Sequence, residues 1–408
     1  MSEVDANDII ERRACITGVG QSDIGRRLYR DPLELTIDAV LAAVADAGLE
    51  LSDIDGLSTY PGPGMAGAPG FSGAGAYEVI DALRLNCGWY GSGIETSGQL
   101  GSVINACLAV AAGLANHVVC FRSVYEGSAQ GEKGRSAVMP GADSGGGGGV
   151  PKISGFMEWQ LPFSAPSAAV WIAMYAQRHF HDFGTTKEQM AWIPLNARRN
   201  AELNPKAIYR DPMTMDDYMA SRIISTPFSL FDCDAPCDGS TAVIVSRIDR
   251  ARDLRHRPLR VEAVGTRIAD RPSWDQLYDL AAMPNRDAAK QLWTRTDLKP
   301  DDVQTLQAYD GFSWLTLSWI EALGFCEVGE GGPFIDGGKR IARDGQLPLN
   351  THGGQLSAGR LHGYGFLHEA ATQMWDEGGD RQIATPPEIG MVAAGGGNTC
   401  GCMLLVRE

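Results

Sequence analysis

The amino-acid sequence predicts an α/β protein made of two similar halves. The chain has 408 residues, which is more than one typical hydrophobic core holds, so two units of comparable size are expected. A segment near residue 300 repeats the pattern of a segment near residue 50. Each half also contains a run of small apolar residues, which predicts a buried helix.

The first strand and the first helix are marked by their flanking residues. Residues 14–20 form a short apolar run that ends in glycine, which predicts a strand. Asp31 and Pro32 then favour a helix start, because aspartate accepts bonds from free backbone N–H groups and proline has the helical φ. Apolar residues recur at helical spacing as far as Ala47, and Gly48 predicts the helix end.

An internal repeat supports the division into halves. Residues 298–309 repeat the pattern of residues 51–60 without a gap, so that Tyr309 corresponds to Tyr60. Upstream of it, residues 259–265 resemble the first strand. A period near 250 residues is far too long for a solenoid and indicates a duplicated α/β domain.

Two runs of small residues predict the central helices. Residues 101–115 are apolar nearly all round, so we expect this helix to be buried on all sides, between two sheets. Residues 117–121 then predict a core strand. Residues 363–371 occupy the corresponding place in the second half.

The composition of the sequence changes between residues 123 and 225. This stretch includes the glycine run 145–149, and its later part has a helical pattern richer in aromatic and charged residues. We interpret it as a loop or cap excursion that covers an active site. The predicted organisation is a first half of residues 1–122 and 226–257, a cap of residues 123–225, and a second half of residues 258–408.

The charge balance excludes some partners. The formal net charge is -15, and nucleic acids attract clustered cations, so we expect no nucleic-acid partner. An anionic ligand such as a CoA thioester would need a local basic patch. Arg122, Lys133 and Arg135 are candidates for it, and a solvated charged loop is the alternative.

The termini and apolar runs carry no membrane or export signal. The first thirteen residues are acidic and polar, unlike a signal or transit peptide. No apolar run approaches the roughly 20 residues that cross a bilayer. We therefore expect a cytoplasmic protein that does not enter the membrane.

The nine cysteines predict reduced thiols. An odd number without a regular framework is typical of a reducing compartment. The pairs Cys233/Cys237 and Cys400/Cys402 have no second ligand pair at zinc-finger spacing, so no metal site is predicted in this chain.

Four motifs follow one another along the chain, at residues 237–245, 309–313, 350–363 and 392–397. They look like an Asp-Gly-Ala-Ala strand, a His-Asp-Cys-Phe segment, an Asn-x-x-Gly-Gly…Gly-His-Pro-x-Gly loop and a closing Cys-x-Gly-Gly-Gly. In this order and spacing they resemble the thiolase superfamily, specifically its sterol-carrier and lipid-transfer branch. The resemblance covers essentially the whole chain. It implies a duplicated thiolase fold of five layers (αβαβα), with two central helices between two sheets.

The catalytic cysteines of a thiolase are missing from this sequence. Gly98 stands at the helix start where a thiolase has its nucleophilic cysteine, and Ala393 replaces the second cysteine. The two oxyanion-hole histidines are replaced by Tyr309 and Arg360. Acyl-enzyme chemistry is therefore not expected.

These departures are similar to those of the thiolase-like aldolases of bacterial steroid side-chain degradation. Those aldolases lack both cysteines and carry tyrosines in place of the histidines, a pattern that Tyr309 fits and Arg360 does not. The resemblance implies a homodimer that joins a small zinc-ribbon and OB-fold subunit into a heterotetramer. Zinc is then expected only in that partner, and the CoA thioester is a substrate rather than a cofactor of this chain.

A retro-aldol cleavage of a β-hydroxyacyl-CoA needs a base, donors for the thioester enolate and an acid, but no nucleophile. Tyr309 beside Arg360 is the predicted base, because a neighbouring positive charge favours phenolate. His362 or Tyr364 is the predicted acid, and His352 is a further catalytic candidate. The predicted substrate-binding residues are Gly98, Asn350, Gly395 and Gly396.

Other interpretations of these residues stay open at this point. Tyr309 could pack as a strand-end aromatic, Arg360 could bind CoA phosphates or pair with an acid, and Asn350 could hold a turn. The rival functions are a noncatalytic acyl-CoA or lipid carrier and a condensing enzyme without an acyl-enzyme step.

Overall fold

The structure is a computed structural model of the chain. It describes residues 9–61, 69–93, 96–132, 157–165, 167–269, 277, 279, 283–396 and 399–408. Lys133, Arg135 and the glycine run 145–149 lie outside the described residues. Among the described residues, no helix is both long and apolar enough to cross a membrane.

Nine strands form one mixed sheet in the order β3-β2-β4-β7-β1-β8-β11-β10-β9. The first five belong to the N-terminal half: β1 (Ala14–Gln21), β2 (Gly56–Thr59), β3 (Trp89–Ser92), β4 (His117–Tyr125) and β7 (Asp238–Arg247). The last four belong to the C-terminal half: β8 (Leu259–Ile268), β9 (Thr305–Ala308), β10 (Ile389–Gly396) and β11 (Thr399–Arg407).

The two half-sheets meet at β1 and β8. Only two residue pairs join these strands, Cys15 with Arg260 and Ile16 with Leu259. The strand order runs outward from this junction in the same sense in both halves, so β1, β7, β4 and β2 correspond to β8, β11, β10 and β9. In each half the two outer strands of these four are parallel and the others are antiparallel. The duplication predicted from the sequence is therefore present in the topology.

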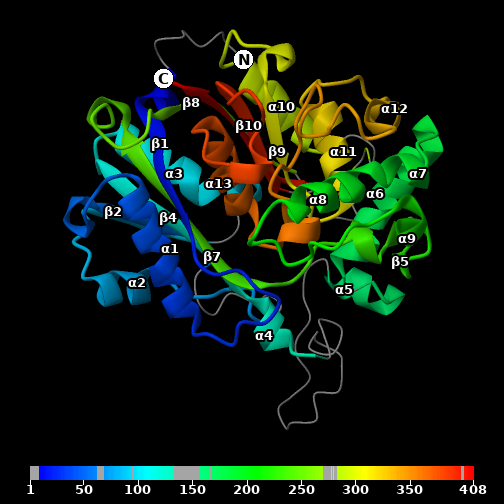
Figure 1. Cartoon of the computed structure of the whole chain (residues 1–408), viewed down its shortest axis with the longest axis horizontal. Helices are drawn as coiled ribbons and strands as arrows, with labels where there is room; N and C mark the ends of the chain where they lie inside the picture. The colour runs from blue at the N-terminus through cyan, green and yellow to red at the C-terminus, as the bar shows by residue number, and fades with distance from the viewer. Residues whose placement is uncertain are drawn as a thin grey trace.

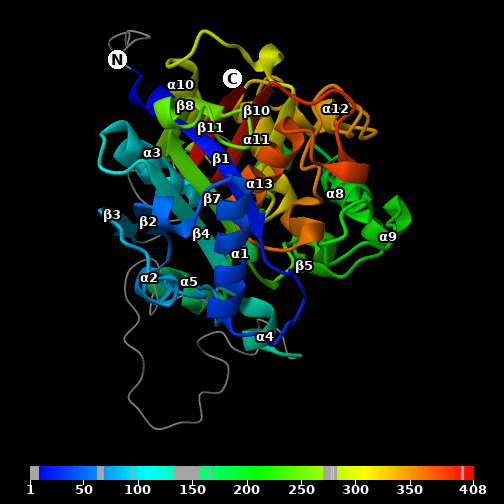
Figure 2. The same cartoon turned by 60° about the vertical axis from the view of Figure 1, so that its left-hand side comes forward.

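Layers of helices alternate with the two half-sheets to give five layers, as Figures 1 and 2 show. Helices α3 (Gly101–Ala111) and α13 (Gly363–Met374) lie in the middle and share one hydrophobic core with β1, β7, β10 and β11. Helices α1 (Pro32–Asp46) and α2 (Ala76–Leu83) cover the outer face of the first half-sheet. Helices α10 (Asn285–Trp293) and α11 (Ser313–Ala322) cover the outer face of the second. The predicted thiolase fold is confirmed.

Local sequence explains how closely α1 approaches the sheet. The Asp31 side chain accepts a bond from Leu33 N (2.7 Å), which caps the helix as predicted. Gly18 and Gly20 of β1 face this helix, and a Cβ on Gly20 would come within 2.4 Å of Ala39 O. Only glycine lets the strand and helix pack at this distance.

One expectation for the central helices is wrong. Leu108 on α3 is 43% exposed, although the helix was expected to be buried on all sides. Its outer side lines a groove of about 570 Å³ beside β3, together with Trp89 and Leu114. This side of the helix therefore faces a groove, not the interior of the chain.

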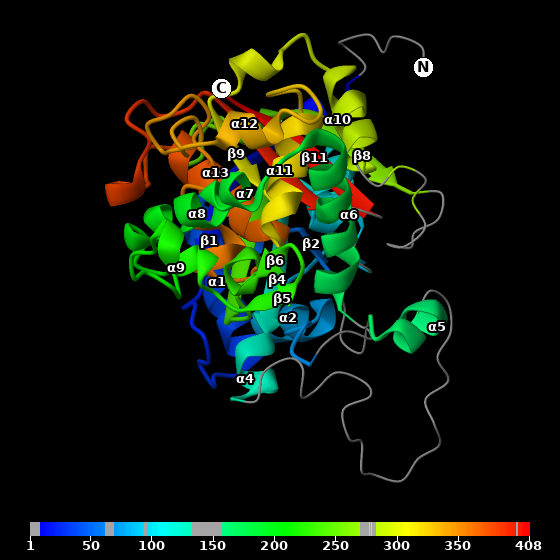
Figure 3. The same ribbon diagram turned by 90° about the vertical axis from the view of Figure 1, so that its right-hand side faces the viewer.

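The described part of the predicted cap region forms helices and a pair of short strands, on the side of the molecule that faces the viewer in Figure 3. Its longest helix is α6 (Ala168–Phe183), which begins at Ser167, an N-cap that accepts a bond from Ala169 N. A buried pair, His179 Nε2 with Glu321 Oε1 (2.9 Å), joins α6 to α11. The other elements are α4 (Glu126–Gln130), α5 (Met157–Gln160), α7 (Lys187–Met190), α8 (Trp192–Glu202), α9 (Met215–Met219), β5 (Ile223–Ser225) and β6 (Phe228–Ser229); α12 (Gly331–Ile335) follows α11.

Candidate active site

Tyr309 directly follows the end of β9 and is held there through its backbone. Its N–H donates to Ala393 O on β10 (2.9 Å). Asn350 fixes the preceding residue from the other side: its Oδ1 accepts from Ala308 N and its Nδ2 donates to Ala308 O, both at 2.8 Å. Because both ends of its amide bind this strand, Asn350 shapes the site without lining the cavity.

Tyr309 opens into a cavity of about 410 Å³ under α6. The polar part of its wall comes from the strand ends and the loop before α13, and includes Asp234, Arg360 and His362. The apolar part comes from the cap and from α11. The lining residues are Phe71, Gln99, Ala168, Trp171, Ile172, Asp234, Tyr309, Phe312, Leu315, Arg360, His362, Gly395, Gly396 and Thr399.

Arg360 is buried and held by two carboxylates. Its Nε donates to Glu126 Oε2 (2.7 Å) and a terminal nitrogen contacts the other oxygen of the same carboxylate. Its second terminal nitrogen lies 3.4 Å from Asp234 Oδ2. Burial acts to lower the pKa of Arg360, but Asp234 and Glu126 outweigh it and raise the pKa. The positive charge beside Tyr309 is therefore offset by two acids, which weakens the expected stabilisation of a phenolate.

His362 is the predicted acid that lines the cavity. It precedes the first residue of α13 with φ +56°, in the left-handed region that non-glycine residues rarely adopt. Its backbone N–H donates to Gln355 Oε1 (3.0 Å). Its ring meets the edge of the Phe71 ring, with centroids 4.9 Å apart, at the cavity wall.

Tyr364, the alternative acid, lies elsewhere. Its hydroxyl forms a 2.7 Å hydrogen bond with Ser102 Oγ between the two central helices. Burial raises the pKa of the Tyr364 phenol well above its ordinary value. The structure does not bring Tyr364 to the cavity of Tyr309.

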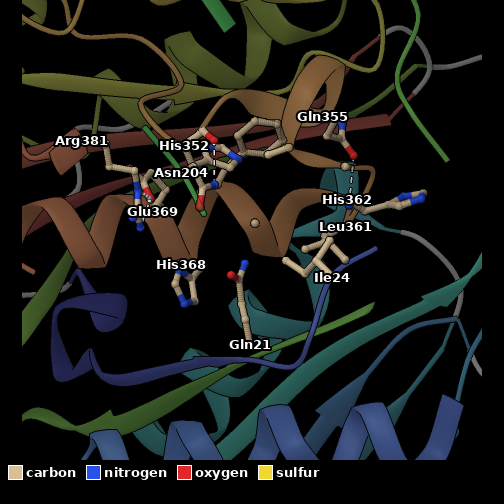
Figure 4. Close-up of a pocket in the computed structure, with 14 residues that line it drawn as sticks. Gln21, Ile24, Asn204, His352, Gln355, Leu361, His362, His368, Glu369 and Arg381 are labelled. Atoms are coloured by element: carbon tan, nitrogen blue, oxygen red, sulfur yellow. Dashed lines mark hydrogen bonds and ion pairs between the residues drawn. The ribbon is translucent and has the colours of Figure 1, made fainter. Parts of the chain in front are cut away.

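His352 lines a second chamber beside α13, shown in Figure 4. Its ring meets the edge of Phe366 at 5.5 Å, and burial lowers the pKa of His352 to about 4. Asn204 and His368 line the same chamber. His362 lines this chamber as well as the cavity of Tyr309, whereas His352 lines the chamber only.

The position of the thiolase nucleophile is closed by the backbone. Gly98 has φ +56°, and a Cβ there would lie 2.0 Å from Ala394 O. Gly395, with φ +73°, packs against Gly98, because a Cβ on Gly395 would lie 2.5 Å from Gly98 Cα. Trp319 Nε1 donates to Gly395 O (2.8 Å) and keeps this contact in place. Gly395 and Gly396 line the cavity, whereas Gly98 does not.

Arg122 does not belong to an exposed basic patch. It is 1% exposed, and its guanidinium lies over the rings of Tyr60 and Phe71, at 5.2 and 4.9 Å from their centroids. The alternative of a solvated loop residue is excluded by the same burial. Lys133 and Arg135 lie outside the described residues, so the predicted patch is not tested there.

Sequence reasoning missed two carboxylates of the site. Asp234 lines the cavity and Glu126 lies directly behind Arg360. A signal for them exists, because an arginine in a glycine-rich buried loop needs an acid nearby. The partner itself could not be named from sequence, because Glu126 is separated from Arg360 by 234 positions.

Comparison with known proteins identifies the family. The chain is 36% identical over 373 residues to a steroid side-chain-cleaving aldolase of Thermomonospora curvata, covering 89% of this chain and 90% of that protein. It is 34% identical over 382 residues to the 17-hydroxy-3-oxo-4-pregnene-20-carboxyl-CoA lyase of Mycobacterium tuberculosis, covering 90% and 92%. The chain belongs to the steroid side-chain-cleaving aldolases. It is thus a carbon–carbon lyase of the thiolase superfamily, as the sequence motifs predicted.

Structures place this aldolase within the thiolase fold. The Ltp2-ChsH2(DUF35) aldolase superimposes with a TM-score of 0.84 at 31% identity, covering 98% of this chain and 99% of that one. The family description "Thiolase C-terminal domain-like" matches residues 267–406. An SCP2-thiolase-like protein of Mycobacterium smegmatis, with a TM-score of 0.67 and 16% identity, shares the fold alone.

Proposed function

We propose that this aldolase cleaves the side chain of a steroid carried as a β-hydroxyacyl-CoA thioester and releases a short acyl-CoA. The observation that supports this most is the end of β9. Tyr309 opens into a large cavity there, while the backbone of Ala394 fills the place of a nucleophilic side chain. The site can therefore move protons and bind an oxyanion but cannot form an acyl-enzyme.

Each step of the cleavage has a candidate residue in this cavity. Tyr309 in its phenolate form accepts the proton of the β-hydroxyl group and becomes a neutral phenol. The oxygen electron pair then forms the ketone, the Cα–Cβ bond breaks, and its electrons pass into the thioester as an enolate. His362 delivers a proton to Cα, which completes the acyl-CoA product.

Arg360 suits the role of enolate donor in spite of its ion pairs. A guanidinium has five N–H groups, and the contacts to Glu126 and Asp234 use one N–H on each of its three nitrogens. One N–H on each terminal nitrogen is left for the thioester oxygen. Glu126 and Asp234 hold the group rigid, which is what an oxyanion donor requires.

The shape of the cavity fits a large apolar substrate with one polar end. Trp171 and Ile172 of the cap and Phe312 beside α11 supply a wall for fused rings. The polar groups are few and gathered at Tyr309, which is the usual composition of a site that orients an apolar ligand.

Assembly and location extend the proposal. The solved neighbour is named as a complex of Ltp2 with ChsH2(DUF35). We propose that this chain likewise joins a small DUF35 subunit, with a zinc ribbon and an OB-fold, and that zinc belongs to that subunit. The apolar groove at Leu108 supports a homodimer inside the same heterotetramer. A cytoplasmic location is part of this proposal.

A direct experiment separates the aldolase from a lipid carrier. The purified chain, alone and with its DUF35 partner, is incubated with 17-hydroxy-3-oxo-4-pregnene-20-carboxyl-CoA, and the products are identified by mass spectrometry. The aldolase proposal predicts a steroid ketone and a short acyl-CoA in equal amounts. Tight binding of the thioester without cleavage, in both preparations, would contradict it and favour the carrier.

A further inference from the structure

Arg122 is a buried cation whose charge no described carboxylate balances. It is 1% exposed, and its guanidinium donates hydrogen bonds to two backbone oxygens, Phe71 O and Ser123 O. Its Nε has no hydrogen-bond partner among the described residues. An unpaired charge is costly to bury. Arg360, by contrast, forms ion pairs with two carboxylates. The cost of burying Arg122 therefore indicates that its side chain has a function.

The contacts of Arg122 lead to the active-site wall. It holds Phe71 twice, through the carbonyl oxygen and through the ring face 4.9 Å away. The Phe71 ring also makes a T-shaped contact with the His362 ring, with centroids 4.9 Å apart. Phe71 thus contacts both a buried cation and the residue proposed to deliver the proton.

Phe71 lies in residues 69–75, the described residues directly before α2, which form neither helix nor strand. Two backbone bonds fix this segment to the end of β4, Tyr125 N to Gly70 O (2.8 Å) and Gly73 N to Ser123 O (3.1 Å). Glycines make this contact possible, since a Cβ on Gly70 would lie 2.2 Å from Tyr125 O. The backbone bonds hold the main chain on either side of Phe71, and the Arg122 guanidinium lies over the Phe71 ring.

We infer that Arg122 is a positioning residue of the active site: through Phe71 it fixes the ring of His362 toward the cavity of Tyr309. This inference rests on the proposed function in one respect, the role of His362 as proton donor. It assigns the N-terminal half a part in a reaction whose other groups lie mainly in the C-terminal half.

The test measures proton transfer without carbon–carbon cleavage. Propionyl-CoA is incubated with the purified complex in D₂O, and deuterium entering its α-carbon is followed by mass spectrometry. Phe71→Leu keeps an apolar side chain but removes the ring, and we expect exchange to fall at least about tenfold. Phe71→Tyr keeps the ring and should stay within about twofold of the wild type. Binding of propionyl-CoA should change little in either variant, because positioning acts on the proton-transfer step.

A double-mutant cycle ties the effect to Arg122. Arg122→Met removes the charge and the donors, and the double variant with Phe71→Leu should be no slower than the worse single variant, since both break one chain of contacts. If Arg122→Met does not fold, Arg122→Lys takes its place, because lysine keeps the charge but loses the planar fork.

Three results would overturn the inference: wild-type exchange in Phe71→Leu, independent effects of the two substitutions, or no exchange in the wild type. Failure of the proposed function looks different, because the wild type would then exchange the α-proton of propionyl-CoA but leave the steroid thioester intact.

Discussion

In each half of the chain a tyrosine follows the same strand of the duplicated fold, but the two tyrosines have different surroundings. Tyr60 follows β2 and Tyr309 follows β9, at matching places of the duplicated topology. Tyr60 is 2% exposed and belongs to the central core, with the Tyr364 ring 6.2 Å away. Tyr309 is half-buried, borders three hydrophobic clusters and faces the cavity.

The residue on the neighbouring strand makes the difference. One position beyond the last pair of β2 and β4, Tyr60 has Arg122 as its neighbour, and the guanidinium covers its ring. At the corresponding position beyond β9 and β10, Tyr309 has Ala394, followed by Gly395 and Gly396. The Arg122 side chain covers the Tyr60 ring, although Tyr60 also borders the groove beside β3, whereas three small residues leave the cavity side of Tyr309 open. Duplication thus supplied two equivalent places, and we propose that the place at Tyr309 became the active site.

The largest expected effect on stability comes from the acid behind Arg360. Glu126→Gln keeps the shape of the side chain but leaves a buried arginine with Asp234 alone. We expect the free energy of unfolding to fall by about 3 kcal/mol, the usual cost of removing one member of a buried ion pair. Denaturant unfolding measures this. An unchanged denaturation midpoint would show that the ion pair between Glu126 and Arg360 does not stabilise the fold.

Restoring the thiolase nucleophile should fail for steric reasons. Gly98→Cys places a Cβ 2.0 Å from Ala394 O in a backbone region unfavourable to side chains. We expect a loss of about 2 kcal/mol in stability and no acetyl-CoA acetyltransferase activity. Thiolase turnover in the variant, at unchanged stability, would contradict the closed position.

Asp310, next to Tyr309, should make stability depend on pH. Burial raises the pKa of Asp310 from 3.8 to about 7, while backbone N–H groups, Gln355 N among them, partly oppose this. The folded state therefore binds more protons than the unfolded state between about pH 4 and 7. Stability from this group is present below that window and is lost as pH rises through it, by at most about 1.4 kcal/mol per pH unit. Asp310→Asn should flatten that slope in unfolding curves recorded from pH 4 to 8, and an identical slope would refute the assignment.

The smallest expected effect is that of thiol alkylation. Six of the nine cysteines are buried, and the other three, Cys87, Cys233 and Cys326, are half-buried. Burial raises the pKa of Cys326 to about 12, and that of Cys87 also above its ordinary value, which lowers thiolate reactivity. Iodoacetamide should leave turnover largely intact. Rapid inactivation with labelling of a single cysteine beside the cavity would contradict a mechanism without cysteine.

Local patterns predicted the parts of the molecule that local physics decides. The Asp31 cap, the strands at residues 14 and 259, and the equivalence of Tyr60 and Tyr309 follow from short-range propensity and from the repeat. Tyr309 could be placed in the site because motif position fixes where a strand ends.

Long-range packing decided what the sequence did not show. A buried arginine and a solvated one look alike in sequence, so the alternatives for Arg122 were a basic patch or a solvated loop, and neither placed it in the core. His362 and Tyr364 are two positions apart, and only the turn into α13 directs one to the cavity and the other to Ser102. The acids that hold Arg360 come from distant segments and were missed.

The most direct test of the account compares the two strand-end tyrosines in one assay. Tyr309→Phe and Tyr60→Phe each remove one oxygen and keep the ring, so unfolding should change little in both. With 17-hydroxy-3-oxo-4-pregnene-20-carboxyl-CoA as substrate, turnover should fall at least about a hundredfold in Tyr309→Phe, the scale of a lost general base or oxyanion donor. Tyr60→Phe should turn over like the wild type, and both should bind the thioester normally. Equal turnover in the two variants would contradict the assignment of the reaction to the open strand end.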